Sequence, residues 1–183
     1  MSVIDSYSFT NITEGVTLIG GETTKVGQSI TGDGQTLLGT GGIVFWCKKV
    51  NSPDGSVYGS LYAFDTETNL PTGTALTISN GNLASGINYA LWDATSFRWD
   101  NDYVYKLEDG VKYLVTLEYD GVTTFGSVLV GVDTSTPTHS GSYYQYADGA
   151  WSEVSTQDCA FSIVGTRILE AGDKHGLPAF KKA

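Results

Sequence analysis

The residues best suited to binding chemistry in this sequence are aromatic, and they crowd one short segment. Tyr143, Tyr144, Tyr146 and Trp151 are interleaved with hydroxyl, amide and carboxylate side chains, and an Asp-Gly pair predicts a tight turn within the segment. In a strand, Tyr144 and Tyr146 share one face while Tyr143 lies on the other, so at least one ring should point outward. Outward rings beside polar groups suit stacking on a sugar ring or burial in a protein interface.

Trp46 is a fifth aromatic residue with a predicted outward position. It stands in an alternating run in which Phe45 and Cys47 occupy the opposite face. The candidate residues for binding a glycan or a protein partner are therefore Trp46, Tyr143, Tyr144, Tyr146 and Trp151. The competing interpretation is that these rings pack beneath a neighbouring loop or strand.

Residues for catalysis are sparse. The sequence has two histidines, His139 in a loop rich in Ser and Thr and His175 in the polar C-terminal tail. A general base needs an oriented partner and a nucleophile, and the sequence contains no nucleophile elbow, phosphate loop or zinc-protease motif. We therefore expect no catalytic residues and no cofactor. The abundant carboxylates leave a glycosidase pair open.

Two acidic clusters offer oxygen ligands for a structural calcium ion. One alternates Asp65 with Glu67, and the other contains Asp100 and Asp102. The first lacks the glycine and the final acid of an EF-hand loop, so turn formation by solvated acids is the competing interpretation.

Two cysteines, Cys47 and Cys159, both fall inside apolar strand patterns and stand in no zinc-binding spacing. Buried free thiols are the default expectation for such residues, and a single disulfide is the alternative.

Short strands separated by turns must position all these residues. Asp-Gly, Asn-Gly and Gly-Gly pairs recur along the chain, and the runs between them are rich in Val, Ile, Thr, Tyr and Trp. In residues 111–119, Tyr113, Val115 and Leu117 alternate with mostly polar side chains, which indicates a half-buried antiparallel strand. Residues 167–172 could form one helical turn. Other expected strands cover residues 27–31, 43–48, 56–63, 74–79, 89–97, 127–132, 143–146, 151–154 and 159–164.

This spacing of strands predicts an all-β fold, a two-sheet antiparallel jelly-roll sandwich over residues 16–165. Residues 1–15 are interpreted as an N-terminal extension and residues 166–183 as a C-terminal tail. The first and last strands of a jelly roll are commonly neighbours. We therefore expect residues 27–31 to pair with residues 160–165, and both extensions to leave from one end.

The charge distribution bears on the partners. The formal net charge is −10, and so acidic a surface repels a nucleic-acid backbone. The tail from Thr166 carries a net charge of +2, which leaves −12 on the rest of the chain. This asymmetry indicates that the tail is a separate element, with Arg167, Leu177 and Phe180 as candidate anchoring residues. The competing interpretation is a solvated, frayed terminus. No apolar run approaches the ~18 residues typical of a membrane span.

One stretch of the sequence resembles a known module. Residues 131–141 read Gly-Val-Asp-Thr-Ser-Thr-Pro-Thr-His-Ser-Gly and precede the aromatic segment and the strand expected near residues 158–165. Together with shorter pieces further upstream, this pattern resembles a jelly-roll β-sandwich module of bacteriophage virion proteins and environmental bacterial surface proteins, over about residues 25–165. The resemblance implies a sandwich without catalytic residues, and it assigns no ligand residues.

Two functional hypotheses follow. The first is a non-enzymatic phage structural protein on the virion surface, as a head decoration or fibre-like subunit. It would bind other virion proteins through its terminal extensions and form a homo-oligomer. The second is a carbohydrate-binding module for adsorption to a host or another surface, acting extracellularly or at a cell surface. An enzyme ranks third, because it would need a carboxylate pair facing a cleft.

Overall fold

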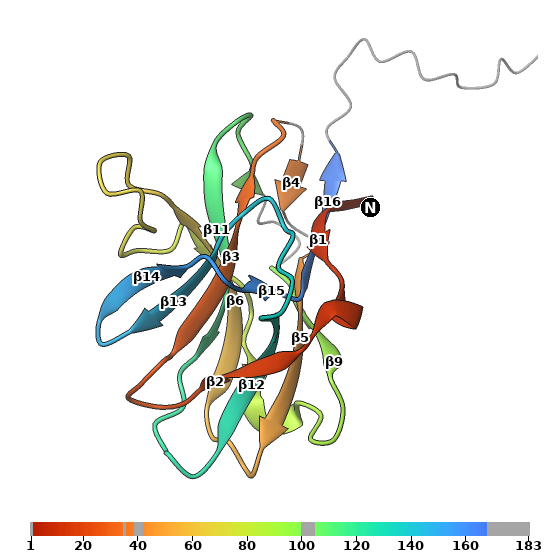
Figure 1. Cartoon of the computed structure of the whole chain (residues 1–183), viewed down its shortest axis with the longest axis vertical. Helices are drawn as coiled ribbons and strands as arrows, with labels where there is room; N and C mark the ends of the chain where they lie inside the picture. The colour runs from red at the N-terminus through yellow and green to blue at the C-terminus, as the bar shows by residue number, and fades with distance from the viewer. Residues whose placement is uncertain (1, 35, 39–41, 100–104, 168–183) are drawn as a thin grey trace, which may run out of the picture.

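The computed structural model describes residues 2–34, 36–38, 42–99 and 105–167 of the chain. Over these residues the chain forms two antiparallel sheets, of nine and seven strands, which face each other as a sandwich (Figure 1). The all-β two-sheet sandwich predicted from the sequence is therefore confirmed. Within the described part of the chain, no helix has the length and apolar character needed to cross a membrane.

Sheet A, the nine-stranded sheet, contains both ends of the described chain. Its centre is β5 (Ile43–Val50), which pairs with β16 (Phe161–Arg167) through its first half and with β12 (Ser127–Asp133) through its second half. The remaining strands of sheet A are β1 (Ser2–Tyr7), β2 (Glu14–Leu18), β4 (Thr36–Leu38), β9 (Asp93–Phe97), β10 (Tyr105–Lys106) and β15 (Asp158–Cys159).

Sheet B, the seven-stranded sheet, runs in the order β14-β13-β3-β11-β6-β7, and β8 also pairs with β6. Its strands are β3 (Lys25–Thr31), β6 (Ser56–Ala63), β7 (Thr77–Ile78), β8 (Asn82–Leu83), β11 (Lys112–Tyr119), β13 (Tyr143–Ala147) and β14 (Ala150–Val154). Two short 3-10 helices complete the described elements, η1 (Phe9–Asn11) and η2 (Ala84–Gly86). The successive long strands β3, β5, β6, β9, β11, β12, β13 and β16 alternate between the sheets, which is the crossing pattern of a jelly roll.

Alternate residues of the strands point into the core between the sheets, as predicted from the sequence. Tyr113, Val115 and Leu117 of β11 are buried, as are Phe45 and Cys47 of β5. Removing side chains of this size from water stabilises the fold by roughly 1.5–3 kcal/mol each, before the cost of ordering them is counted.

Both cysteines lie in this core as free thiols. Burial raises the pKa of the Cys47 thiol to about 12, so it stays protonated and unreactive at neutral pH.

The first 15 residues are not an extension, so that prediction is wrong. Residues 2–7 form β1, which pairs along β16 with Ser2 opposite Gly165, and residues 14–18 form β2, which pairs with β12. These are edge strands. Tyr7 is the only β1 side chain, of those whose exposure is described, that is buried. The alternating hydrophobic pattern that marks a half-buried strand is therefore missing from this part of the sequence.

The predicted pairing of residues 27–31 with residues 160–165 is also wrong. β3 lies in sheet B between β11 and β13, whereas β16 lies in sheet A between β1 and β5. β3 is the third strand of the chain, and the strand that pairs with the last one is the first, β1. The start of β1 and the end of β16 nevertheless lie side by side (Figure 1).

Two other predicted strands are shorter in the structure. β7 covers only residues 77–78 of the expected 74–79, and β9 begins at Asp93 rather than at residue 89. The second difference has a local cause. Asn88 Oδ1 accepts hydrogen bonds from the N–H groups of Ala90 and Leu91, which curls this segment into a turn. The expected helical turn begins at Arg167, which ends β16, and its other residues lie outside the described part of the chain.

Strand register separates the two ends of the sandwich. β5 starts at Ile43, opposite Ile163, and ends at Val50, opposite Ser127. The loops that follow β5 and precede β12 therefore lie far from the start of β1. Asp93 is opposite Cys47, which brings the loop before β9 to the same end. We call residues 19–24, 51–55, 84–92 and 120–126 the distal end, which is the lower end in Figure 1.

Candidate functional site

The β13–β14 hairpin has the turn and the face assignment that the sequence predicted. Asp148 and Gly149 both adopt positive φ angles, of 53° and 81°. Tyr144 and Tyr146 share one face, and Tyr143 points the other way into the core between the sheets, where it has no exposed surface. Tyr143 therefore cannot contact a ligand in this conformation.

Tyr144 and Trp151 lie on the outer face of sheet B, but they are not exposed. Tyr144 is 0% and Trp151 is 8% exposed, and they cluster with Tyr62 and Leu114. Phe64, Leu70 and Ala75, from the end of β6 and the segment that follows it, pack against this cluster. For these two residues the structure shows the competing interpretation, namely packing beneath a neighbouring segment.

Two lysines occupy ring faces in this outer cluster. The Lys25 ammonium lies 5.2 Å from the ring centroids of both Tyr62 and Tyr146, and it forms an ion pair of 2.8 Å with Glu118. Lys112 lies 4.2 Å from the ring centroid of Phe64 and donates a hydrogen bond of 3.0 Å to the Tyr144 hydroxyl. These ammonium groups occupy the ring faces on which a sugar would stack. The aromatic rings on the outer face of sheet B therefore already have partners within the protein.

Trp46 keeps its predicted outward direction and part of its exposure. Its ring stacks on Phe9 of η1, with centroids 5.6 Å apart and planes inclined by 19°. Trp46 lies on sheet A, whereas the still partly exposed Tyr146 lies on sheet B. The five predicted aromatic residues therefore do not form one site.

His139 lies at the centre of a buried polar network that joins the two sheets. Gln28 Nε2 donates to Asp158 Oδ1 at 2.8 Å, and the same amide lies 3.1 Å from His139 Nδ1. His139 Nδ1 also accepts a hydrogen bond from the N–H of Gly141, so the ring proton resides on Nε2, which lies 3.0 Å from Asp5 Oδ1. Both ring nitrogens thus hold the loop 134–142 against β3 and β1.

A second link between β1 and the same loop runs through Asp133. Tyr7 donates its hydroxyl to Asp133 Oδ2 at 2.7 Å, while Asp133 Oδ1 accepts from Ser135 and from the N–H of Thr136. Desolvation raises the pKa of Asp133, but the hydrogen bonds from Tyr7, Thr136 and Ser135 outweigh it and lower the pKa to about 2.

An Asp133→Asn variant is expected to be less stable than the wild type at neutral pH by roughly 1–3 kcal/mol, because a charge-assisted acceptor is lost. The lowered pKa means that the carboxylate contributes fully above about pH 4. That contribution disappears as the pH falls through about 2. Urea unfolding of both proteins at pH 6, 3 and 2 checks this, and a difference in stability that does not change with pH would contradict it.

The Asp65 carboxylate accepts hydrogen bonds from residues that follow it directly in the chain. Its Oδ1 atom accepts hydrogen bonds from the N–H groups of Glu67 and Thr68 and from the Thr68 hydroxyl, and those from Thr68 contribute most to lowering the pKa of Asp65. This is the geometry of a turn, the alternative to calcium binding. Among the described residues, no three His, Cys, Asp or Glu side chains are placed to share a metal ion. Asp100 and Asp102 lie outside the described residues.

Of the predicted anchoring residues, only Arg167 falls within the described chain. Its backbone ends β16 and pairs with Thr36 of β4. Leu177 and Phe180 lie outside the described residues.

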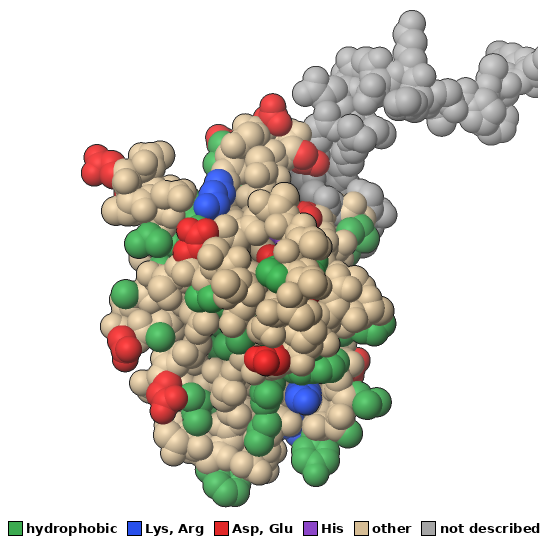
Figure 2. All heavy atoms as spheres, in the orientation of Figure 1, with side chains coloured by type: hydrophobic (Ala, Val, Ile, Leu, Met, Phe, Trp, Pro, Cys, Tyr) green, Lys and Arg blue, Asp and Glu red, His purple; other side chains and the backbone are tan. Residues whose placement is uncertain are grey.

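Large apolar side chains gather at the distal end, and no sequence pattern predicted this. Tyr89, Leu91, Val122 and Phe125 are each at least 69% exposed, and so is Leu83, which directly precedes the distal segment 84–92. Figure 2 shows hydrophobic side chains protruding along the lower rim of the molecule. Hydrogen bonds fasten the loops that carry some of these side chains.

Asp54 and Asn51 form the hydrogen bonds that hold the 120–126 loop. Asp54 Oδ1 accepts from the Tyr119 hydroxyl and from Thr123, and Asn51 Nδ2 donates to the Phe125 carbonyl at 2.8 Å. These hydrogen bonds therefore hold the 120–126 loop, which carries the exposed apolar side chains of Val122 and Phe125.

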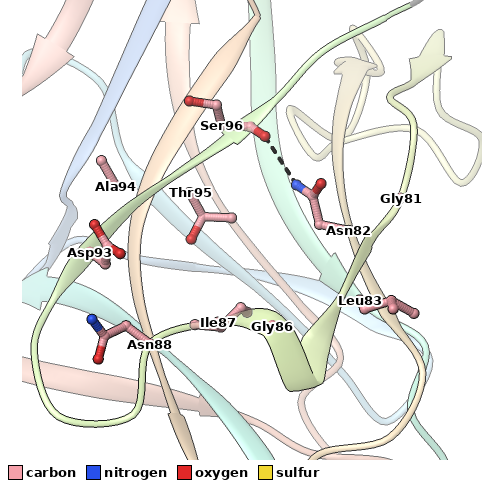
Figure 3. A pocket seen from close by; sticks show the side chains of 10 residues that line it. All are labelled: Gly81, Asn82, Leu83, Gly86, Ile87, Asn88, Asp93, Ala94, Thr95 and Ser96. Carbon is pink, nitrogen blue, oxygen red and sulfur yellow. Dashed lines mark hydrogen bonds between the residues drawn. The ribbon is translucent and has the colours of Figure 1, made fainter.

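A cleft of about 480 Å³ opens beside the distal end, between β8 and η2 on one side and β9 on the other (Figure 3). Asn82 spans it, since its Nδ2 atom donates to the Ser96 carbonyl at 3.0 Å. The polar lining is completed by the side chains of Asn88, Asp93 and Thr95, and the apolar lining by Leu83, Ile87 and Ala94. No binding motif marks these residues in the sequence. Asp93, Ala94 and Thr95 belong to a predicted strand, and the other lining residues belong to short elements and a turn.

Comparison with known proteins identifies no relative of this chain. No protein family, no curated protein and no solved structure matches it. Its function is therefore inferred from the geometry described above and from the sequence.

Proposed function

We propose that this chain is a non-enzymatic structural protein of a bacteriophage particle, displayed on the virion surface and attached through its terminal segments. The observation that carries the proposal is the pairing of Ser2 with Gly165, which brings the start of β1 and the end of β16 together at one end of the sandwich. Attachment there leaves the distal end facing away from the particle. The virion itself is inferred from the sequence resemblance.

The surface properties support display rather than burial in a particle wall. The net charge of −10 keeps the sandwich soluble and discourages contact with packaged nucleic acid. The distal end carries exposed apolar side chains on fastened loops, as a surface that meets an external partner would. We propose that several copies act together as a homo-oligomer on the particle.

Deleting residues 168–183 tests the attachment. We expect the truncated protein to fold normally, because the described strands all remain, and to bind particles at least ~10-fold more weakly. Binding is measured by co-sedimentation with phage particles that lack the protein. A Val122→Ser, Phe125→Ser double variant at the distal end serves as the matched control and should bind normally. Full binding by the truncated protein would overturn attachment through the tail.

A carbohydrate-binding role is the second candidate. The aromatic hairpin does not support this role, because its Tyr143, Tyr144 and Trp151 are buried. The observation that favours it now is the polar cleft beside the distal end.

A further inference from the structure

We infer that the cleft between β8 and β9 is a binding site for a neutral saccharide. The inference rests on the carbohydrate-binding candidate above, for which it names the site and the ligand class, and it does not depend on attachment to a particle. It rests on the hydrogen-bonding groups that face the cleft, on the rigidity of its walls and on its position in the sandwich.

The cleft presents acceptors and a donor, and hydrogen bonds fix the directions of two of these side chains, Asn82 and Asn88. Asn82 Nδ2 is committed to the Ser96 carbonyl, which leaves Oδ1 as an acceptor. Asn88 Oδ1 accepts from the N–H groups of Ala90 and Leu91, which leaves Nδ2 as a donor. Figure 3 shows Asn88 and the Asp93 carboxylate on the same side of the cleft. The Asp93 carboxylate makes no hydrogen bond or ion pair with another described residue, so its oxygens can accept from a ligand.

This arrangement suits a sugar because each sugar hydroxyl can donate and accept at once. Separate, oriented acceptors and donors bind such groups well, and the volume of about 480 Å³ is within the usual range for small-molecule sites. Leu83 and Ala94, which are both exposed, supply apolar surface for the C–H face of a ring. Asp93 and the net charge of −10 oppose an acidic sugar, so the ligand class is neutral.

The cleft walls are held in place before any ligand arrives. The N–H of Ala84 donates to the Gly55 carbonyl at 3.1 Å, and the N–H of Lys49 donates to the Asn88 carbonyl at 2.8 Å. Gly81 packs so closely on Tyr58 that a Cβ atom there would lie 2.6 Å from the ring. A prearranged site loses little freedom on binding, which favours affinity for a small ligand.

An extended peptide is a poorer fit to the same cleft. It would have to add to the open edge of β9, but two carbonyls on that edge already have partners. The Ser96 carbonyl accepts from Asn82, and the Arg98 carbonyl accepts from the N–H of Asn80 at 3.0 Å. The main-chain ladder on which strand addition depends is thereby interrupted.

Two glycines provide a test with a matched control. Gly86 lines the cleft, and a Cβ atom added there would meet nothing within 4 Å, so a Gly86→Trp variant should fold while filling the cleft. Gly73 has the same open surroundings but lies outside the lining, so Gly73→Trp adds the same ring elsewhere. Asp93→Ala removes one acceptor without removing a side-chain hydrogen bond or ion pair to a described residue.

The full chain is screened on an array of neutral and sialylated oligosaccharides that includes bacterial surface glycans and soluble plant glycans. The strongest free oligosaccharide is then titrated by calorimetry. We expect binding to a neutral member, at least ~10-fold weaker binding by Asp93→Ala, no measurable binding by Gly86→Trp and wild-type binding by Gly73→Trp. The bacterial and plant members of the array distinguish a host-surface source from a soluble one.

Three results would overturn the assignment: no neutral ligand on the array, binding that Gly86→Trp leaves intact, or equal loss in Gly73→Trp. Co-sedimentation of Gly86→Trp with phage particles keeps the two proposals separate. If the variant still binds particles but no sugar, the cleft and the attachment are independent. A failure of particle binding by the wild type would leave the sugar result unaffected.

Discussion

Replacing Gln28 with leucine is expected to lower the free energy of unfolding by about 3–5 kcal/mol, although leucine has a similar size and is more apolar. Gln28 is fully buried on the inner side of β3. Its Nε2 atom donates to the Asp158 carboxylate at 2.8 Å, and its Oε1 atom accepts from the N–H of Cys159 at 2.9 Å. Leucine would leave a buried charge short of one donor and a buried N–H without an acceptor.

Urea unfolding followed by tryptophan fluorescence measures this loss. Gln145→Leu is the control, because Gln145 pairs with Val26 in the neighbouring strand but is partly exposed, and its side chain has no hydrogen bond to a described residue. The control should change stability by less than about 1 kcal/mol. Similar losses in both variants would mean that the polar link between the sheets contributes little.

Trp151→Ala is expected to destabilise the protein by about 3–5 kcal/mol, in contrast to about 1 kcal/mol for Trp46→Ala. Trp151 lies 5.4 Å from the Tyr62 ring and 5.1 Å from the Tyr146 ring, and it is nearly buried. Trp46 packs on the half-exposed Phe9 alone among described aromatic rings. The larger cavity at position 151 should therefore dominate.

Thermal and urea unfolding of the two variants compare these costs directly. A Trp151→Ala protein with wild-type stability would contradict the packing described here. It would also return Trp151 to the residues considered for ligand binding.

How much of the fold could be predicted depends on whether a strand buries one face. In β11, alternation correctly predicted that Tyr113, Val115 and Leu117 face the core between the sheets. The predicted half-burial is wrong, because Leu114 and Thr116 on the other face are buried as well. β1 lies at a sheet edge and shows no such alternation, so it was missed. The turn at Asp148-Gly149 was predictable because positive φ angles restrict the residue types there.

The candidate site was predicted less well, because exposure is a property of the tertiary structure. Alternation assigned the directions of Trp46 and Tyr146 correctly. It could not reveal that Phe64 and Leu70 arrive from a different segment to cover Tyr144. The β8–β9 cleft could not be predicted for the same reason, since Asn82 and Asp93 line one cleft only because β8 pairs with β6 and β9 pairs with β5.

The neighbouring positions of Ser2 and Gly165 also bear on how this domain can be joined to other chains. Residues directly opposite each other in an antiparallel pair have Cα atoms only about 4.5–5.5 Å apart. A domain whose entry and exit lie so close can be inserted into a surface loop of another protein without pulling that loop open. The sandwich is therefore suited to insertion into another protein, where it would display the distal loops and the cleft on the surface.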